Sequence, residues 1–167
     1  MDGANIFQPG IGPGRGARSE EPRKPELARS AARDVFDPTR SDHFIRRGDK
    51  VYAGTHLIIE VVDGTGLDEE ERIQQAFRDC VDACGATLVH IHTHKFSPRG
   101  VSGVAVLAES HISVHTWPEI GYGAFDVFMC GSARPWHAVD VLAAAFETSD
   151  IRVRELLRGD SLIEAPT

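Results

Sequence analysis

The apolar residues of this chain are concentrated in one part of it, and that concentration limits what the chain can fold into. Nearly all the apolar periodicity lies after Tyr52, whereas the first 40 residues hold ten Gly or Pro and no sustained repeat. A segment of that kind cannot bury enough apolar surface to repay its ordering entropy. We therefore expect residues 1–50 to be a flexible tail and residues 51–167 to form one folded domain.

The apolar patterns after residue 52 predict strands and helices in a fixed order. Residues 55–62 are rich in β-branched and aliphatic side chains and precede a turn sequence, DGTG, so they predict a strand. Residues 69–84 repeat apolar positions at three- and four-residue steps, start with acidic side chains and end before Gly85, which predicts a helix. The later segments are four predicted strands at 86–94, 101–110, 111–117 and 123–130, a helix opened by Pro135 and running through 136–147, and a last strand at 151–157.

This order allows both helices to cover one face of a mostly antiparallel sheet. We therefore predict an α+β fold, a two-layer sandwich with its helices on one face of the sheet. The sequence has no repeat of solenoid period and no glycine-rich phosphate loop before a helix.

The charge and the cysteines narrow the possible partners and compartment. Residues 51–167 hold seventeen acidic and eight basic side chains, which argues against a nucleic acid as partner. No apolar run approaches the roughly 20 residues that span a bilayer, and the N-terminus lacks the apolar core of a secretory signal. The three cysteines are an odd and sparse set, typical of a reducing compartment. We expect a cytoplasmic protein with no membrane partner.

Residues 107–130 carry more reactive side chains than a solvated hairpin needs. Hydroxyl, imidazole, carboxylate and thiol groups together supply a nucleophile, a base and an acid. The candidate residues of this segment are Glu109, Ser110, His111, Ser113, His115, Thr116, Trp117, Glu119 and Cys130.

The spacing of these residues resembles that of the bacterial and archaeal S-adenosylmethionine decarboxylase proenzymes. The resemblance spans roughly residues 55–157. Its matching sequences are GVSG at 100–103, ESH at 109–111, HTWPE at 115–119 and CG at 130–131. The run HTWPE begins five residues after Ser110, and Cys130 lies twenty residues after Ser110, which makes the combination specific.

The resemblance implies that the chain cleaves itself between Glu109 and Ser110. In that family the serine hydroxyl attacks the preceding carbonyl, and the serine becomes a covalent pyruvoyl group that forms a Schiff base with the substrate amine. Ser102 matches a hydroxyl that assists processing, and His115 matches the processing base, which we expect across a turn from Ser110. Cys130 matches the proton donor. Neither pyridoxal phosphate nor a metal is expected.

The resemblance also implies the substrate, S-adenosylmethionine, and the product, decarboxylated S-adenosylmethionine for spermidine biosynthesis. Phe96 matches an aromatic that stacks on adenine, with His115 on the opposite face. Glu119 matches the carboxylate that binds the ribose hydroxyls, and Trp117 is a candidate contact for the sulfonium cation. The family dimerises, so we expect a homodimer of cleaved protomers.

Two other functions remain open from the sequence. A pyruvoyl-dependent decarboxylase of a basic amino acid, ornithine or arginine, would use the same chemistry at Ser110. A non-catalytic metal-binding module is the second alternative, because His90, His92 and His94 alternate along a predicted strand and put three imidazoles on one face. The remaining cysteines, Cys80 and Cys84, lie one helical turn apart on an apolar face and are expected in the core.

Overall fold

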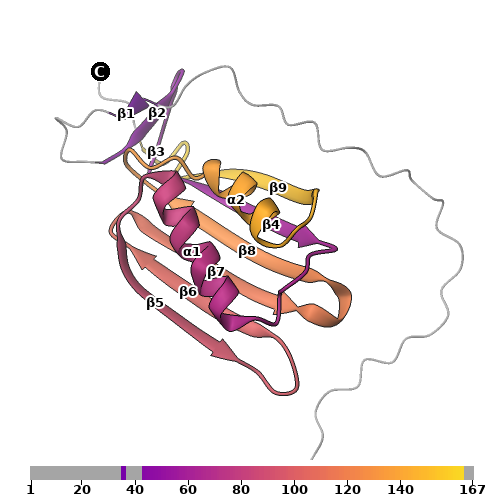
Figure 1. Ribbon diagram of the computed structural model, residues 1–167. Helices are drawn as coiled ribbons and strands as arrows, with labels where there is room; N and C mark the ends of the chain where they lie inside the picture. The colour runs from indigo at the N-terminus through magenta and orange to yellow at the C-terminus, as the bar shows by residue number, and fades with distance from the viewer. Residues whose placement is uncertain (1–34, 37–42, 164–167) are drawn as a thin grey trace, which may run out of the picture.

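An antiparallel sheet with two helices across one of its faces forms the body of the protein (Figure 1). The computed structural model describes residues 35–36 and 43–163. The helices are α1 (Glu70–Cys84) and α2 (His137–Ala145). The strands of this sheet are β4 (Gly54–Val62), β5 (Leu88–Lys95), β6 (Val101–Leu107), β7 (Ser110–Trp117), β8 (Tyr122–Met129) and β9 (Asp150–Arg158). The predicted α+β two-layer sandwich is thereby confirmed.

The strands lie in the order β5-β6-β7-β8-β4-β9, and every neighbouring pair is antiparallel. Strands β5 to β8 follow chain order, as the predicted meander requires, whereas β4 lies between β8 and β9. Within β4 the side chains of Leu57, Ile59 and Val61 are fully buried and alternate with more exposed ones. This two-residue period gives the sheet one apolar face for the helices to cover.

The helices supply the other half of the core. α1 presents its apolar stripe to the sheet and ends at Gly85, which adopts the left-handed conformation that glycine accepts without strain. The thiols of Cys80 and Cys84 are buried in this core, as predicted. α2 begins two residues after Pro135 and packs on α1. None of the helices formed by the described residues has the length and apolar character needed to cross a membrane.

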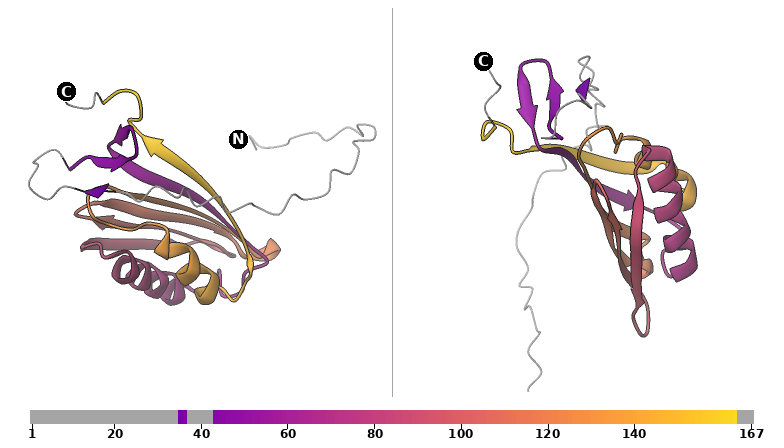
Figure 2. Two further views of the ribbon diagram at one scale, coloured as in Figure 1. Left: turned by 90° about the horizontal axis from the view of Figure 1, so that it is seen from above. Right: turned by 90° about the vertical axis from the view of Figure 1, so that its left-hand side faces the viewer.

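The opposite face of the sheet, here called the open face, bears polar side chains that alternate with the core residues. Both helices lie on the other side, as Figure 2 shows. His56 and Ser113 both hydrogen-bond to Asp126 on this face, at 3.1 Å and 3.3 Å. Ser102 and His115 also lie on it, since their neighbours along β6 and β7 are core residues.

A second, three-stranded sheet lies before β4 in the chain. Its strands are β1 (Val35–Phe36), β2 (Ile45–Arg47) and β3 (Lys50–Tyr52). Ile45 and Tyr52 are buried, and β3 is separated from β4 only by Ala53. The sequence boundary at residue 50 therefore falls inside a hairpin, whose short apolar pattern was too brief to indicate a strand. Residues 1–34 and 37–42 of the predicted tail lie outside the described part.

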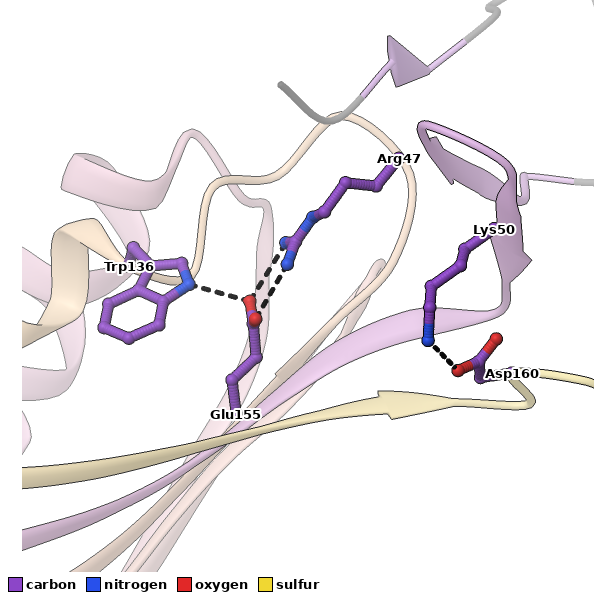
Figure 3. A network of polar contacts seen from close by, with 5 residues as sticks. All are labelled: Arg47, Lys50, Trp136, Glu155 and Asp160. Carbon is purple, nitrogen blue, oxygen red and sulfur yellow. Dashed lines mark hydrogen bonds and ion pairs between the residues drawn. The ribbon is translucent and has the colours of Figure 1, made fainter. Parts of the chain in front are cut away.

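Two ion pairs fasten this hairpin to the main sheet (Figure 3). The guanidinium of Arg47 donates two hydrogen bonds to the carboxylate of Glu155 on β9, at 2.7 Å and 2.9 Å. Glu155 also accepts a 2.9 Å bond from the indole N–H of Trp136. Lys50 pairs with Asp160 at 2.6 Å just beyond the end of β9. The first pair is largely shielded from water, and the second is exposed.

Replacing Arg47 should destabilise the fold more than replacing Lys50. Arg47 and Glu155 expose only 12% and 23% of their side chains, and Arg47→Met leaves the Glu155 carboxylate without its bidentate partner. We expect a loss of about 1–3 kcal/mol of unfolding free energy in urea titrations. The control is Lys50→Met, whose pair is 49% and 34% exposed and whose loss should lower the unfolding free energy less. Equal losses would contradict this ranking.

Candidate active site

The turn between β6 and β7 holds the backbone in an unusual conformation. Leu107 pairs with Ser110 across the ladder, so only Ala108 and Glu109 connect the strands. Ser110 has a φ of 153°, in the region that side-chain-bearing residues avoid. Such a conformation persists only where its surroundings enforce it, and it is characteristic of functional sites. The strained residue is the predicted nucleophile.

The carbonyl oxygen of Glu109 accepts two hydrogen bonds from Cys130. The backbone N–H of Cys130 donates at 3.1 Å and its Sγ at 3.0 Å. The ladder between β7 and β8 brings them together, because Ser110 pairs with Met129, the residue before Cys130. Two donors on one carbonyl oxygen polarise the C=O bond and stabilise negative charge that develops on that oxygen during nucleophilic attack. The peptide predicted to break therefore has the electrostatic support that attack requires.

The surroundings of Cys130 keep its thiol protonated at neutral pH. Burial raises the pKa of Cys130 above its usual range, and the negative charge of Glu109 raises this pKa further. A thiol in this state can donate a hydrogen bond and a proton. This property suits the proton-donor role predicted for Cys130.

The side chain of Glu109 is fixed as firmly as its carbonyl. The backbone N–H of Thr87 donates to one carboxylate oxygen at 2.8 Å, and the hydroxyl of Thr87 donates to the other at 3.1 Å. Sequence reasoning missed Thr87, because a threonine at the start of a β-prone segment has no feature that distinguishes it from an ordinary strand residue. Only the folded connection between α1 and β5 brings it to Glu109.

Ser102 and His115 form a pair of their own on the open face. They are directly opposite in the β6–β7 ladder, and the hydroxyl of Ser102 lies 2.6 Å from Nδ1 of His115. We expected His115 to lie across a turn from Ser110, and within a single chain this expectation is wrong. β7 runs without interruption from Ser110 to Trp117, so five residues of extended strand, about 17 Å, separate the two.

The predicted substrate-binding residues lie at the His115 end of the sheet. Phe96 follows β5 and makes an edge contact with His94, and its N–H bonds to Gly100 across the β5–β6 loop. Trp117, at the end of β7, lies 6.5 Å from His115 between ring centroids. Glu119 is exposed in the short 3-10 helix η1 (Pro118–Ile120). Phe96 and Trp117 are about half exposed and so offer aromatic surface to a ligand.

Three further residues organise this end of the sheet and were missed by sequence reasoning. The side chain of Asp68 accepts a 2.8 Å bond from the N–H of Gly100, which fixes the Phe96 loop and lowers the pKa of Asp68. Tyr122 stacks on Trp117 and donates a hydrogen bond to Glu60, which raises the pKa of Tyr122 to about 12. No spacing along the chain indicates the bonds of Asp68 to Gly100 and of Tyr122 to Glu60, because the partners are 32 and 62 residues apart in the sequence.

The three histidines of β5 share one face, but they do not gather around a point. His90, His92 and His94 are all exposed on this edge strand. Across the part of the chain that the structure describes, no three His, Cys, Asp or Glu side chains are arranged to hold a metal ion. The geometry therefore does not favour the metal-binding alternative.

Comparison with known proteins assigns this chain to a class of enzymes, the decarboxylases. Residues 55–159 match the family described as S-adenosylmethionine decarboxylase, and the chain belongs to that family. It is 46% identical over 116 residues to the S-adenosylmethionine decarboxylase proenzyme of Methanococcus aeolicus, covering 68% of this chain and 98% of that protein. The proenzyme of Thermosipho africanus is 44% identical over 109 residues, covering 64% of this chain and 84% of that protein.

A solved structure agrees with these relatives. The crystal structure of the adenosylmethionine decarboxylase from Aquifex aeolicus aligns with a TM-score of 0.63 at 30% sequence identity, covering 70% of this chain and 97% of that chain. The resemblance identified in the sequence is thus confirmed.

The backbone strain at Ser110 should be measurable as a difference in unfolding free energy between two variants. Ser110→Gly and Ser110→Ala both remove the hydroxyl, but only glycine accepts a φ of 153° without strain. We expect the unfolding free energy of the uncleaved Ser110→Gly chain to exceed that of Ser110→Ala by about 1 kcal/mol. This difference already includes the cost of the greater entropy that glycine has in the unfolded state. Urea titrations of the two chains make the comparison. A more stable alanine variant would show that the turn is unstrained.

Proposed function

We propose that this decarboxylase makes its own pyruvoyl group from Ser110 and then converts S-adenosylmethionine to decarboxylated S-adenosylmethionine and CO2 for spermidine biosynthesis. The observation that carries the proposal is the Glu109 carbonyl, held by two donors of Cys130 beside a residue with a strained backbone. In this proposal residues 51–167 are the decarboxylase domain.

Self-cleavage begins with attack of the Ser110 hydroxyl on the Glu109 carbonyl carbon. The C–N bond breaks, the nitrogen of Ser110 takes up a proton, and an ester links Glu109 to the Ser110 side chain. A base then removes the α-proton of Ser110, and the ester C–O bond breaks to release the Glu109 carboxylate and leave dehydroalanine. Water hydrolyses this product to a pyruvoyl group and ammonia. The Cys130 donors stabilise the oxyanion of the first step, where they are worth several kcal/mol in enzymes of known mechanism.

The pyruvoyl group supplies a carbonyl that binds the substrate amine and accepts the electron pair released with CO2. The chain's own residues complete the reaction. Cys130 holds a proton at neutral pH beside Ser110 and delivers it to the substrate carbon after CO2 has left. All three cysteines are free, and a cytoplasmic location suits an enzyme that depends on a free thiol.

A homodimer completes the site. Within one chain the Ser102–His115 pair and Ser110 lie at opposite ends of β7. A two-fold axis that lies between two packed open faces, perpendicular to β7 and level with its middle, would exchange these ends. His115 of the partner subunit then stands beside Ser110 and acts as the processing base, with Ser102 holding its imidazole. The same packing covers the open face, including the exposed apolar side chains of Val106 and Leu156.

The residues at the His115 end then bind the nucleoside of the substrate. Phe96 stacks on the adenine ring, with His115 on the opposite face, and the Glu119 carboxylate binds the ribose hydroxyls. The aromatic face of Trp117 attracts the sulfonium cation. The curated relatives that match this chain are S-adenosylmethionine decarboxylase proenzymes, so the basic amino-acid alternative, ornithine or arginine, is not favoured.

Purified protein should consist of two fragments, residues 1–109 and 110–167. We expect Ser110→Ala to stay intact on a denaturing gel, because it lacks the nucleophile. Cys130→Ala should still cleave, about 10-fold or more slowly, since its backbone N–H remains, yet lose most turnover for want of a proton donor. Release of labelled CO2 from S-adenosylmethionine, with ornithine and arginine as controls, measures activity. Activity in an uncleaved chain would end the proposal.

Mixed dimers test the partner's role in processing. A chain carrying Ser110→Ala and a chain carrying His115→Ala should each remain largely uncleaved when expressed alone. Co-expressed, they form dimers in which one site combines the intact Ser110 of one chain with the intact His115 of the other. We expect the His115→Ala chain to be cleaved only in the mixture. Tags of different length separate the chains on a gel, and no gain of cleavage on mixing would contradict the shared site.

A further inference from the structure

We propose that Thr87 is a positioning residue for self-cleavage, because it fixes the Glu109 carboxylate and thereby holds the Glu109 carbonyl between Cys130 and the Ser110 hydroxyl. The inference rests on the proposed self-processing at Ser110. It assigns a function in that reaction to a residue outside the segment that carries the other processing groups.

Thr87 holds the cleavage turn at three points. Its N–H and its hydroxyl donate to the two oxygens of the Glu109 carboxylate, at 2.8 Å and 3.1 Å. Its carbonyl accepts a 3.0 Å bond from the N–H of Ala108. Both connecting residues of the turn are therefore bound to the same residue on the adjacent chain segment.

The rigidity of Thr87 comes from the end of α1. Gly85 closes the helix in the left-handed conformation, and the N–H of Ala86 donates to the carbonyl of Val81 at 3.0 Å. β5 begins at Leu88 and pairs there with Leu107 of β6. Thr87 thus lies between a capped helix and a paired strand, with little freedom to move relative to the turn.

Hydrogen bonds from two different segments fix Glu109. Cys130 binds the carbonyl oxygen from β8, and Thr87 binds the carboxylate from the α1–β5 connection. With both in place, the turn has little freedom to relax away from the strained φ of Ser110. Intramolecular attack depends steeply on such geometry, since the gain from proximity requires the reacting atoms to stay aligned.

The threonine hydroxyl can be tested apart from the backbone. Thr87→Val keeps the shape and the N–H bond and removes the hydroxyl bond, so we expect cleavage to slow about 3- to 10-fold. Thr87→Ser restores a hydroxyl and should cleave within about twofold of wild type. Glu109→Ala loses both Thr87 contacts and should slow cleavage about 10-fold or more. The rate of fragment appearance after cell-free synthesis, followed on denaturing gels, gives these values.

A double-mutant cycle separates positioning from a general loss of structure. If Thr87 acts through Glu109, then Thr87→Val should slow cleavage no further in the Glu109→Ala background. The matched control is Thr148→Val, which likewise removes one hydroxyl hydrogen bond, in this case a 2.6 Å bond to the backbone carbonyl of Val62, outside the cleavage turn. We expect wild-type cleavage rates from it.

The outcomes distinguish this inference from the function on which it rests. A wild-type chain that never cleaves defeats the proposed function itself. Cleavage of wild type and Thr87→Val at the same rate overturns the role of Thr87 alone. Additive effects of Thr87→Val and Glu109→Ala also overturn it, because they would show that the threonine acts elsewhere. Thr87 is exposed, so its variants should keep the wild-type urea midpoint, and an effect explained wholly by a lowered midpoint counts against positioning.

Discussion

The contact between Cys130 and the carbonyl oxygen of Glu109 is the interaction on which the site depends. It exists because β7 and β8 pair with Ser110 opposite Met129, which sets Cys130 against the turn. A shift of that register by one residue would turn the buried side chains of the shifted strand to the opposite face and break the contact. The apolar alternation that holds the sheet in register therefore also holds the Glu109–Ser110 peptide in place.

The candidate site residues lie in two groups, one at each end of β7. The turn proposed to be cleaved lies where β6 ends and β7 begins, and the aromatic and carboxylate groups proposed to bind the nucleoside lie at the other end of β7 with His115. A strand cannot bend to bring its own ends together, so the proposed site draws on a second sheet. The open face, which the described helices leave uncovered, is the surface on which we propose that a second subunit supplies it.

Local sequence patterns are sufficient to predict the helices and strands, but not the contacts between them. The alternation in β4 and the apolar stripe of α1 follow from periods of 2 and 3.6 residues, which a sequence displays directly. Ser110 and Cys130 were found because the family's motif surrounds them. The role of Thr87 and the distance of His115 from Ser110 depend on tertiary placement, which no local period encodes. The β2–β3 hairpin was missed because strands of three residues show no measurable period.

The strand order determines what the proposed cut before Ser110 would do to the molecule. Strands β4, β5 and β6 precede the cut and β7, β8 and β9 follow it, yet β4 lies between β8 and β9, and β6 pairs with β7. The two pieces are interleaved in one sheet, and α1 of the first packs on α2 of the second. The nicked protein therefore could not come apart without dismantling its own core, and the proposed scission would alter the covalent chain while leaving the architecture whole.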